Sequence, residues 1–439
     1  MGNEMKRVLV ITYYWPPSGG SGVQRWVKFS KYLPENGWQP VIYTPENPDL
    51  TTRDKTLGEE IPECAEVIRR PIFEPYGLGR RLFGKDAASQ TEVNPINAQH
   101  KSLKQRLMMA IRGNFFIPDP RCMWIGPSVR FLKKYLHRHP VDIIVSTGPP
   151  HSMHLIARKV ALATGIPWIA DFRDPWTKMF YFKHLHLGRW AGHRHRVLEQ
   201  KVLDDASVIV AVSPLVQQDF KDMTTTPVKL ITNGYDESDF EQVVEPDGYF
   251  NLVHTGLFAS DGNPESLWKA LADKCRTDPE FKDMLRIRLA GKTDREIIMS
   301  IREYGLDGNL FDLGYQSHQT AVREQKGASV LLLPLRKEPE YKAVLPGKLF
   351  EYLASCRPVL GIGQTDGAMA TIIRDTKAGE VFDWDEEAGI SGYINRCWEQ
   401  FKAGTLEVSG DNIEQYSRRA LSKKMAGLME SLINSDIQK

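Results

Sequence analysis

Short apolar runs alternate with longer amphipathic segments along most of this chain, and glycine or proline closes many of the runs. This alternation is typical of parallel α/β structure, in which helices separate short strands. In the first half it predicts a helix at 22–33 and strands at 7–12, 40–44, 141–146, 167–170 and 207–212. After a turn-rich break at 231–240 the pattern starts again and predicts strands at 251–255, 285–290, 309–313, 329–333 and 358–361.

Two successive open α/β units predict two doubly wound, Rossmann-like domains that face a central cleft. Ligands of such sheets bind beyond the carboxyl ends of the strands. We place the first domain at residues 1–235, the second at 236–414, and a final helix at 415–439. Residues 46–125 are the least regular part of the sequence.

Composition narrows the class of protein. The chain has 439 residues, of which 41% are hydrophobic and 26% charged, as in a globular protein. Its five cysteines are scattered without a C-x-x-C pair, which favours a reducing compartment over disulfides or a zinc site. The first apolar run is too short for a signal peptide, and no segment has the ~18 apolar residues of a membrane span. We therefore expect a cytoplasmic, soluble protein.

A glycine-rich segment, YYWPPSGGSGVQRW, follows the first predicted strand. Glycines between a strand and a helix let a ligand approach the backbone, and a helix start favours anionic groups. The spacing of Gly20 and Gly22 is similar to a dinucleotide fingerprint, with Glu46 as the ribose-binding acid, but Arg25 occupies the third glycine position. A nicotinamide or flavin cofactor is therefore disfavoured, and a tight turn without a ligand remains an alternative.

A second segment, AVLPGKLFEYLASCRPVLGIG (343–363), contains a predicted helix start at Pro346 and Gly347. Free N–H groups there can face a phosphate, and Lys348 adds a positive charge. Glu351 lies near the same helical face, and its two carboxylate oxygens match the vicinal hydroxyls of a ribose. By spacing alone, an ordinary amphipathic helix with a surface Lys–Glu pair fits equally well.

Several stretches together make the chain resemble the retaining glycosyltransferases of family four, in particular those of bacterial surface-polysaccharide synthesis. They are the loop at 16–22, ADFRDPW, VIVAVSPLVQQDF, ITNGYDESDF, LVHTGLF and, most specifically, VLPGKLFEYLASCRPVL. The resemblance implies the GT-B architecture, with the acceptor on the first Rossmann-like domain and a nucleotide sugar on the second. It also implies that the final helix packs back onto the first domain.

On the donor side the resemblance assigns the ribose to Glu351. Two features of the family are missing, because Ala343 replaces the glutamate eight positions earlier and no Arg–Lys pair follows Gly256. We expect Lys348 to bind the diphosphate instead, with Lys292 or Arg336 as substitutes. The expected donor-binding residues are then Glu351, Lys348, Gly347, Gly256 and Leu349.

On the acceptor side the resemblance points to loops that follow first-domain strands. The expected acceptor-side residues are Gly19, Gly20, Gly22 and Asp171. Family members often carry a histidine at the position of Thr147, so His151 or His154 would have to serve in its place, or neither does. We expect His151 to act in catalysis together with Asp174. His154 could equally be an ordinary helix residue, and Asp174 could only cap a turn.

For a retaining member the resemblance implies front-face attack, in which the leaving phosphate helps to deprotonate the acceptor. A dedicated general base is then unnecessary, and the protein stabilises the phosphate charge. No cofactor is expected, and the reaction is expected to be independent of metal, as in GT-B enzymes. The sequence Asp383-Trp384-Asp385 looks like a metal-binding D-x-D motif, but it lies in an acidic stretch that fits a solvated loop better.

Two basic stretches without acidic residues, 177–198 and 100–112, lie in the first predicted domain, and the second leads into Phe115 and Phe116. Basic segments interleaved with aromatic residues suit an anionic membrane surface. A basic acceptor cleft or plain helix surface are alternatives, and the net charge of +2 disfavours nucleic acid. We expect a glycan or polyprenyl-linked acceptor and peripheral contact with the inner face of a membrane.

The sequence thus predicts an enzyme that transfers a hexosyl or N-acetylhexosaminyl group from a nucleotide sugar, most simply UDP-linked, in surface glycan biosynthesis. Three alternatives remain: a GT-B nucleotide-sugar 2-epimerase, a Rossmann dehydrogenase and a non-catalytic, membrane-associated assembly partner. The replacement of the family's glutamate by Ala343 keeps the last of these open.

Overall fold

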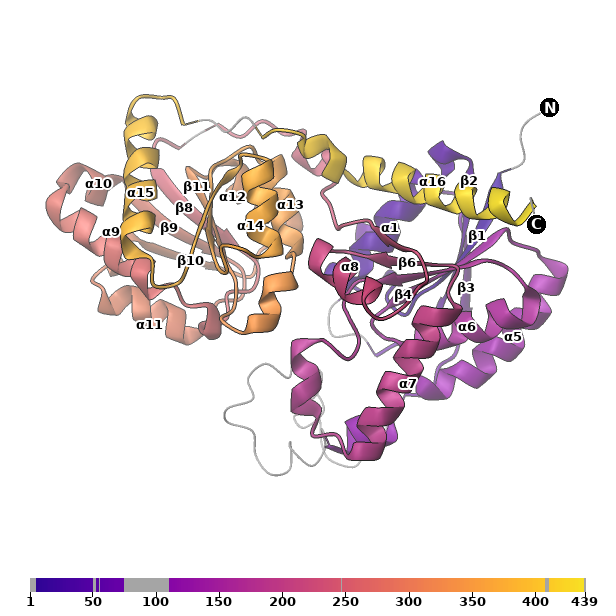
Figure 1. Cartoon of the computed structure of the whole chain (residues 1–439). Coiled ribbons are helices and arrows are strands. Elements are labelled where there is room, and N and C mark those ends of the chain that lie inside the picture. The colour runs from indigo at the N-terminus through magenta and orange to yellow at the C-terminus, as the bar shows by residue number, and fades with distance from the viewer. Residues whose placement is uncertain are drawn as a thin grey trace. The chain divides into compact units, whose positions relative to one another are not determined.

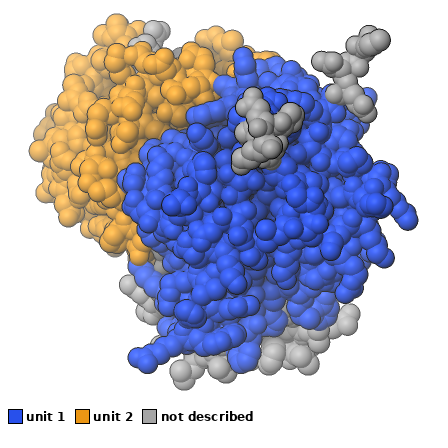
Figure 2. All heavy atoms as spheres, turned by 45° about the vertical axis from the view of Figure 1, so that its right-hand side comes forward, with its two compact units in different colours: residues 1–232, 419–439 blue, residues 233–418 orange. Residues whose placement is uncertain are grey.

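The computed structural model describes residues 5–49, 53–54, 56–74, 110–245, 247–406 and 410–437. The chain divides into two compact units, each built on one parallel sheet (Figure 1). Unit 1 comprises residues 1–232 and 419–439, and unit 2 comprises residues 233–418 (Figure 2). The sequence placed the corresponding boundaries at 235/236 and 414/415.

Unit 1 contains a seven-stranded sheet in the order β3-β2-β1-β4-β5-β6-β7, which reverses between β1 and β4. Its strands are β1 (Lys6–Ile11), β2 (Trp38–Pro45), β3 (Glu66–Arg70), β4 (Ile143–Gly148), β5 (Trp168–Phe172), β6 (Val208–Ala211) and β7 (Val228–Leu230). Consecutive residues of β1, from Val8 to Ile11, are all fully buried. A parallel sheet that is covered by helices on both faces has this property.

The helices of unit 1 are α1 (Ser21–Tyr32), α5 (Ile125–Arg138), α6 (Ser152–Thr164), α7 (Arg189–Asp205), α8 (Pro214–Lys221) and α16 (Arg418–Ile437). On one face of the sheet, Trp26 of α1 and Met425 and Met429 of α16 share a buried cluster with Val8 and Val10. In Figure 1, α5, α6 and α7 lie on the opposite side of this sheet. The final helix therefore completes the core of unit 1, although unit 2 precedes it in the chain.

Unit 2 contains a six-stranded sheet in the order β10-β9-β8-β11-β12-β13, which reverses between β8 and β11. Its strands are β8 (Phe250–Thr255), β9 (Leu285–Ala290), β10 (Leu310–Gly314), β11 (Val330–Pro334), β12 (Val359–Ile362) and β13 (Gly379–Phe382). Its helices are α9 (Glu265–Thr277), α10 (Pro279–Met284), α11 (Arg295–Glu303), α12 (His318–Lys326), α13 (Gly347–Ala354), α14 (Ala368–Asp375) and α15 (Glu387–Lys402). In Figure 1, α12, α13 and α14 lie on one side of this sheet, and α9 and α15 on the other.

Each strand predicted from the sequence is present, with ends shifted by at most two residues. Three observed strands, β3, β7 and β13, were not predicted. All three lie at sheet edges, where one side is unpaired and the residues are partly exposed. An edge strand needs fewer apolar residues, so β3 carries the charged residues Glu66, Arg69 and Arg70, and the hydrophobic pattern is lost.

Candidate functional site

In unit 2 the candidate donor-binding residues gather at the carboxyl ends of β8 and β11, the two strands between which the sheet order reverses. Ligands of doubly wound sheets bind at such a switch point. The backbone pairing of β8 with β11 ends at Val253–Leu331. Beyond it, Nδ1 of His254 lies 3.0 Å from the carbonyl oxygen of Leu332, and the Tyr352 hydroxyl donates to the same oxygen at 3.4 Å.

Gly256 begins the loop after β8 and lies against the loop after β9. A Cβ atom on Gly291 would lie 2.1 Å from the carbonyl oxygen of Gly256, and the two glycines have φ of +155° and +85°. Only glycine satisfies both constraints, so these loops approach more closely than any side chain would allow. A Cβ atom on Gly256 would lie 3.5 Å from Nζ of Lys348, so the loop and this lysine are neighbours.

The start of α13 has no side-chain cap. Pro346 precedes the helix, and the first helical residue, Gly347, is exposed. The first N–H groups of a helix have no partner within the helix and carry a partial positive charge. The expected phosphate-binding helix start is therefore open to a ligand in the described structure.

Lys348 is held at the same place by two protein acceptors. Its Nζ donates to Nε2 of His254 at 3.1 Å and to the carbonyl oxygen of Leu257 at 3.3 Å. Burial lowers the pKa of Lys348 to about 7, and the carboxylate of Glu351 opposes that shift. An anion bound here would favour the charged form of the lysine.

Glu351 lies one turn further along α13 and is half-buried. Its Oε2 accepts a hydrogen bond from Nε2 of Gln325 at 2.9 Å, and the same nitrogen donates to Oγ1 of Thr255 at 3.0 Å. The amide therefore fixes the carboxylate against the end of β8. Within the described part of the chain Oε1 makes no hydrogen bond, so it can accept one from a ligand hydroxyl.

The other expected donor-side residues have different surroundings. Leu349 is fully buried and its N–H donates to the Pro346 carbonyl oxygen at 3.0 Å, so its side chain belongs to the core, and its part in donor binding stays a prediction. Arg336 is paired with Asp261 at 2.8 Å, whereas Lys292 is exposed. Of the three candidate cations, Lys348 is therefore the one that contacts the end of β8.

In unit 1 Asp171, expected on the acceptor side, is a buried structural residue instead. Both of its carboxylate oxygens contact Arg25, the closest pair at 2.8 Å. Trp26 Nε1 and Thr147 Oγ1 donate to Oδ2 at 2.8 and 3.0 Å. Burial raises the pKa of Asp171, but the charge of Arg25 and these hydrogen bonds outweigh it and hold the pKa below its usual value. The carboxylate is fully buried and already bonded, so it has no capacity left for an acceptor.

Arg173 ties together the start of α1 and the loops after β4 and β5. Its two terminal nitrogens donate to the carbonyl oxygens of Gly22 and Pro149. A Cβ atom on Gly22 would lie 2.8 Å from this guanidinium, and one on Gly148 would lie 2.5 Å from Nε2 of His154. These two glycines therefore make room for protein side chains.

Gly19 and Gly20 have different surroundings from Gly22. Gly20 is exposed, has φ of +91° and has no atom within 4 Å of a Cβ position. Gly20 also precedes α1, whose start carries no side-chain cap. Gly19 is half-exposed beside it. Gly20 and, in part, Gly19 therefore remain accessible to a ligand just before α1.

His151 and His154 are both buried in the loop after β4 and the first turn of α6. His151 stacks on Trp176 with ring centroids 4.7 Å apart, and neither of its ring nitrogens has a hydrogen-bond partner in the described structure. Nδ1 of His154 lies 2.7 Å from Oγ of Ser146. Burial lowers the pKa of His154 to about 3 and that of His151 well below 6.5, so both rings are neutral. His151 therefore keeps one donor and one acceptor unused.

Asp174, three residues after Asp171, has the opposite character. It is half-buried, and the described structure gives its carboxylate no hydrogen-bond partner. Burial raises the pKa of Asp174, and the nearby charge of Arg173 only partly opposes this shift. An unsatisfied carboxylate at the carboxyl end of β5 is suited to accept a hydrogen bond from a hydroxyl group.

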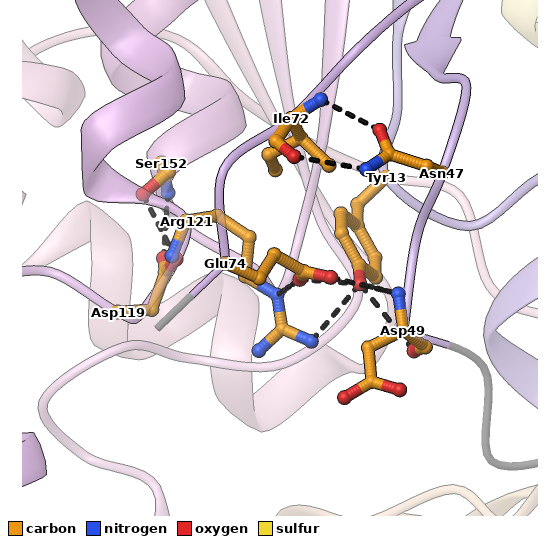
Figure 3. Close-up of polar contacts among 8 residues, drawn as sticks. All are labelled: Tyr13, Asn47, Asp49, Ile72, Glu74, Asp119, Arg121 and Ser152. Carbon is orange, nitrogen blue, oxygen red and sulfur yellow. Dashed lines mark hydrogen bonds and ion pairs between the residues drawn. The ribbon is translucent and has the colours of Figure 1, made fainter. Parts of the chain in front are cut away.

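A polar network that the sequence did not reveal lies at the carboxyl ends of β1, β2 and β3 (Figure 3). The Tyr13 hydroxyl donates to Oε1 of Glu74 at 2.6 Å, and the N–H of Asp49 donates to Oε2 at 2.7 Å. Nε of Arg121 lies 3.0 Å from Oε1 of Glu74, and the guanidinium also donates to the Tyr13 hydroxyl at 3.2 Å. Nearby, Asp119 accepts from the N–H and hydroxyl of Ser152 at 2.8 and 2.9 Å.

These contacts join the loops after β1, β2 and β3 to the segment that precedes α5, and that segment to the first residue of α6. Burial raises the pKa of Tyr13, so the phenol stays protonated and continues to donate. Glu74 and Arg121 lie within residues 46–125, where the sequence has no hydrophobic period that would single them out. Tyr13 comes two residues after the end of β1, and that position alone could have marked it as a candidate site residue.

The basic stretch 177–198 forms part of α7 and the segment before it. Its outer face exposes Arg189, Trp190, His193, Arg194 and Arg196, and the Trp190 side chain is 69% accessible. His195 and Glu199 lie on the buried face. In the second stretch, residues 100–109, including Lys101, Lys104 and Arg106, lie outside the described residues. Among the helices that are described, none is both long and apolar enough to cross a membrane.

The acidic motif after β13 behaves as a surface loop. Asp383 and Asp385 are exposed on either side of buried Trp384, whose Nε1 donates to the Leu335 carbonyl oxygen at 3.1 Å. Over the described ranges no three His, Cys, Asp or Glu side chains are grouped as metal ligands. Independence of metal remains a prediction.

Two parallel, doubly wound sheets of seven and six strands are the arrangement of the GT-B architecture. The sequence profile described as Glycosyltransferase Family 4 matches residues 97–239. The predicted resemblance is thus confirmed over those residues, and the predicted fold over both units.

Solved structures with this fold cover nearly the whole chain. Sucrose-phosphate synthase from Thermosynechococcus elongatus matches with a TM-score of 0.63 and 14% identity, over 98% of this chain and 100% of that one. A glycosyltransferase from Rickettsia africae ESF-5 matches with a TM-score of 0.61 and 14% identity, over 98% and 99%. WaaG, a glycosyltransferase involved in lipopolysaccharide biosynthesis, gives 0.53 and 13%, over 96% and 99%. Curated protein sequences give no match. At these identities the likeness establishes the fold and not the substrate.

Proposed function

We propose that the protein is a retaining glycosyltransferase that transfers a sugar from a nucleotide sugar, most simply UDP-linked, to a saccharide or lipid-linked acceptor in surface glycan biosynthesis. The observation that carries this proposal is the grouping of Gly256, the open start of α13, Lys348 and Glu351 at the switch point of unit 2. A helix start with a lysine suits a diphosphate, and a carboxylate with a free oxygen suits ribose hydroxyls.

The acceptor would bind to unit 1, with Asp174 accepting a hydrogen bond from an acceptor hydroxyl next to the attacking one and neutral His151 contacting a further polar group. In the reaction the bond between the sugar's anomeric carbon and the diphosphate breaks, and a bond to the acceptor oxygen forms on the same face. The acceptor proton passes to an oxygen of the leaving diphosphate. Lys348 and the N–H groups of α13 stabilise the negative charge on that diphosphate, so no metal is required.

The outer face of α7 supports a membrane-linked acceptor. It combines three exposed arginines with an exposed Trp190, and such surfaces bind anionic headgroups while the indole enters the interface. The lipopolysaccharide role in the description of WaaG belongs to that protein, but it agrees with an acceptor of this kind.

Thermal-shift screening against UDP-, GDP-, ADP- and TDP-sugars tests the donor site. A ligand at about 100 times its Kd raises stability by about 2.7 kcal/mol by mass action. We expect a shift with UDP-sugars, its loss in Glu351→Ala, and its retention in the control Glu303→Ala, which alters an exposed glutamate of the same unit. Unchanged affinity in Glu351→Ala would overturn the assignment.

Product analysis separates the remaining alternatives. Transfer with retention, in EDTA and only with an acceptor present, is the expected result. Release of an epimerised nucleotide sugar without acceptor would indicate an epimerase. Failure to bind any nucleotide sugar would support a non-catalytic assembly partner, and activity that only manganese restores would contradict the metal-independent mechanism.

A further inference from the structure

His254 occupies the point where the central strands of unit 2 separate. It is the penultimate residue of β8 and is only 1% exposed. The backbone pairing of β8 with β11 ends one residue earlier, and the imidazole ring spans the gap to the carbonyl oxygen of Leu332. There the ring and the Tyr352 hydroxyl take the place of the backbone donor that a longer strand would supply to this oxygen.

The surroundings fix the protonation of this ring. Nδ1 of His254 lies 3.0 Å from the Leu332 oxygen and Nε2 lies 3.3 Å from the Leu257 oxygen, so each ring nitrogen faces a carbonyl oxygen, which can only accept. A hydrogen on Nδ1 serves the shorter contact and leaves Nε2 to accept from Lys348, which itself donates to the Leu257 oxygen. Burial and the charge of Lys348 lower the pKa of His254 well below 6.5, so the ring is neutral. Its remaining nitrogen, Nε2, therefore presents a lone pair, and Nζ of Lys348 lies 3.1 Å from it.

The ammonium group of Lys348 is thus held in one orientation by hydrogen bonds. Two of its N–H groups are directed at Nε2 of His254 and at the carbonyl oxygen of Leu257. For the third, the described residues offer no partner. Because Nζ also lies beside Gly256, the unused N–H is available where the glycine loop and the start of α13 meet.

We propose that His254 is a positioning residue for the donor diphosphate: its neutral, Nδ1-protonated ring accepts a hydrogen bond from Lys348 and holds the ammonium group beside Gly256. The inference rests on the proposed donor site, and His254 itself contacts no substrate. It gives a role to a histidine in the stretch LVHTGLF, which lacks the Arg–Lys pair of the resembled family.

Binding of the donor at this site is coupled to the uptake of a proton. The titratable groups that face Lys348 are His254 from β8 and Glu351 from its own helix. The pKa of Lys348 is about 7 in the free protein because burial disfavours the ammonium form, and a bound diphosphate raises it again. Above pH 7 binding must therefore take up a proton, so affinity falls by up to about tenfold per pH unit.

The experiment compares His254→Leu, which removes the acceptor, with His254→Gln, which keeps one, and with Lys348→Met. Two quantities are measured for each variant and the wild type. The first is the pKa of the Lys348 amine in the free protein, from the pH dependence of its chemical labelling. The second is the affinity for UDP-glucose between pH 6 and pH 9, since its diphosphate does not titrate in that range.

We expect His254→Leu to lower the pKa of Lys348 and to weaken binding at neutral pH by about tenfold, the effect of losing a hydrogen bond to a charged group. His254→Gln should stay near the wild type in both quantities. Lys348→Met should bind weakly at every pH without the decline above pH 7. If His254→Leu does not fold, His254→Asn replaces it, because its shorter amide cannot reach both Leu332 and Lys348.

Two failures are distinguishable. An unchanged Lys348 pKa and an unchanged pH profile in His254→Leu or His254→Asn, with weak binding in Lys348→Met, would overturn the role of His254 and leave the donor site intact. Equal binding in Lys348→Met and the wild type, or no binding by the wild type, would refute the donor site itself.

Discussion

Asp171 and Asp174 lie three positions apart in the stretch ADFRDPW, yet their environments are opposite. Asp171 is fully buried and bonded to Arg25, Trp26 and Thr147. Asp174 is half-buried and has a raised pKa, and only the charge of Arg173 stabilises its ionised form. A carboxylate that is kept partly desolvated and unsatisfied costs stability, and such groups are common where a protein binds a ligand.

Replacing each aspartate by asparagine separates structure from function. Asp171→Asn should destabilise unit 1 by about 3–5 kcal/mol, because it leaves Arg25 buried without its counter-charge. Asp174→Asn should reduce sugar transfer while leaving thermal stability unchanged or raised. The folded-state pKa of Asp174 is raised, so its charge costs stability as pH rises through that pKa, and asparagine removes the cost above it.

The measurements are melting temperature at pH 5 and pH 8 and the rate of transfer to acceptor. Loss of stability in Asp174→Asn would show that this residue is structural. Full activity and stability in Asp171→Asn would contradict the network around Arg25.

At the scale of elements, the donor site depends on how closely the loops after β8 and β9 approach. Gly291 permits this approach, since a Cβ atom there would overlap the Gly256 carbonyl oxygen, and its φ of +155° disfavours other residues. Neither constraint is visible along the chain, where Gly291 is one of 34 glycines.

Gly291→Ala should lower stability by about 1–3 kcal/mol, the usual range for overpacking, and should weaken nucleotide-sugar binding by displacing Gly256 from Lys348. Gly308→Ala is the matched control, because a Cβ atom there meets nothing within 4 Å. Calorimetric titration and thermal melting check both variants. Equal affinity of the two variants would mean that the loop after β8 does not shape the site.

At the scale of the whole molecule, each unit has its own core, and unit 1 is built from two separate segments of the chain, 1–232 and 419–439. Leu421, Met425, Ala426 and Met429 of α16 are buried in the cluster of unit 1. The outer face of α7, by contrast, leaves three arginines and Trp190 in solvent.

Charge reversal at Arg189, Arg194 and Arg196 should weaken binding to vesicles of anionic lipid by roughly a hundredfold, since each basic residue near such a surface contributes about 1 kcal/mol. Reversal of the exposed Lys423 and Lys424 on α16 serves as the control and should have a smaller effect. Vesicle flotation at low and physiological salt measures both. Equal flotation of the α7 variant and the wild type would exclude this face as a membrane contact.

The sequence by itself determined the two α/β units and most of their strands, because these depend on the local hydrophobic period. It predicted Gly256, Lys348 and Glu351 as donor-binding residues with the help of the family resemblance, and the structure brings Lys348 close to both of the others. The sequence did not determine the edge strands, whose exposed residues lack that period. Only the tertiary structure decided that Asp171 belongs to a buried ion pair, that Leu349 lies in the core, and that His254 meets Lys348. Each of these depends on residues far apart in the chain, and no local pattern records which side chains a fold brings into contact.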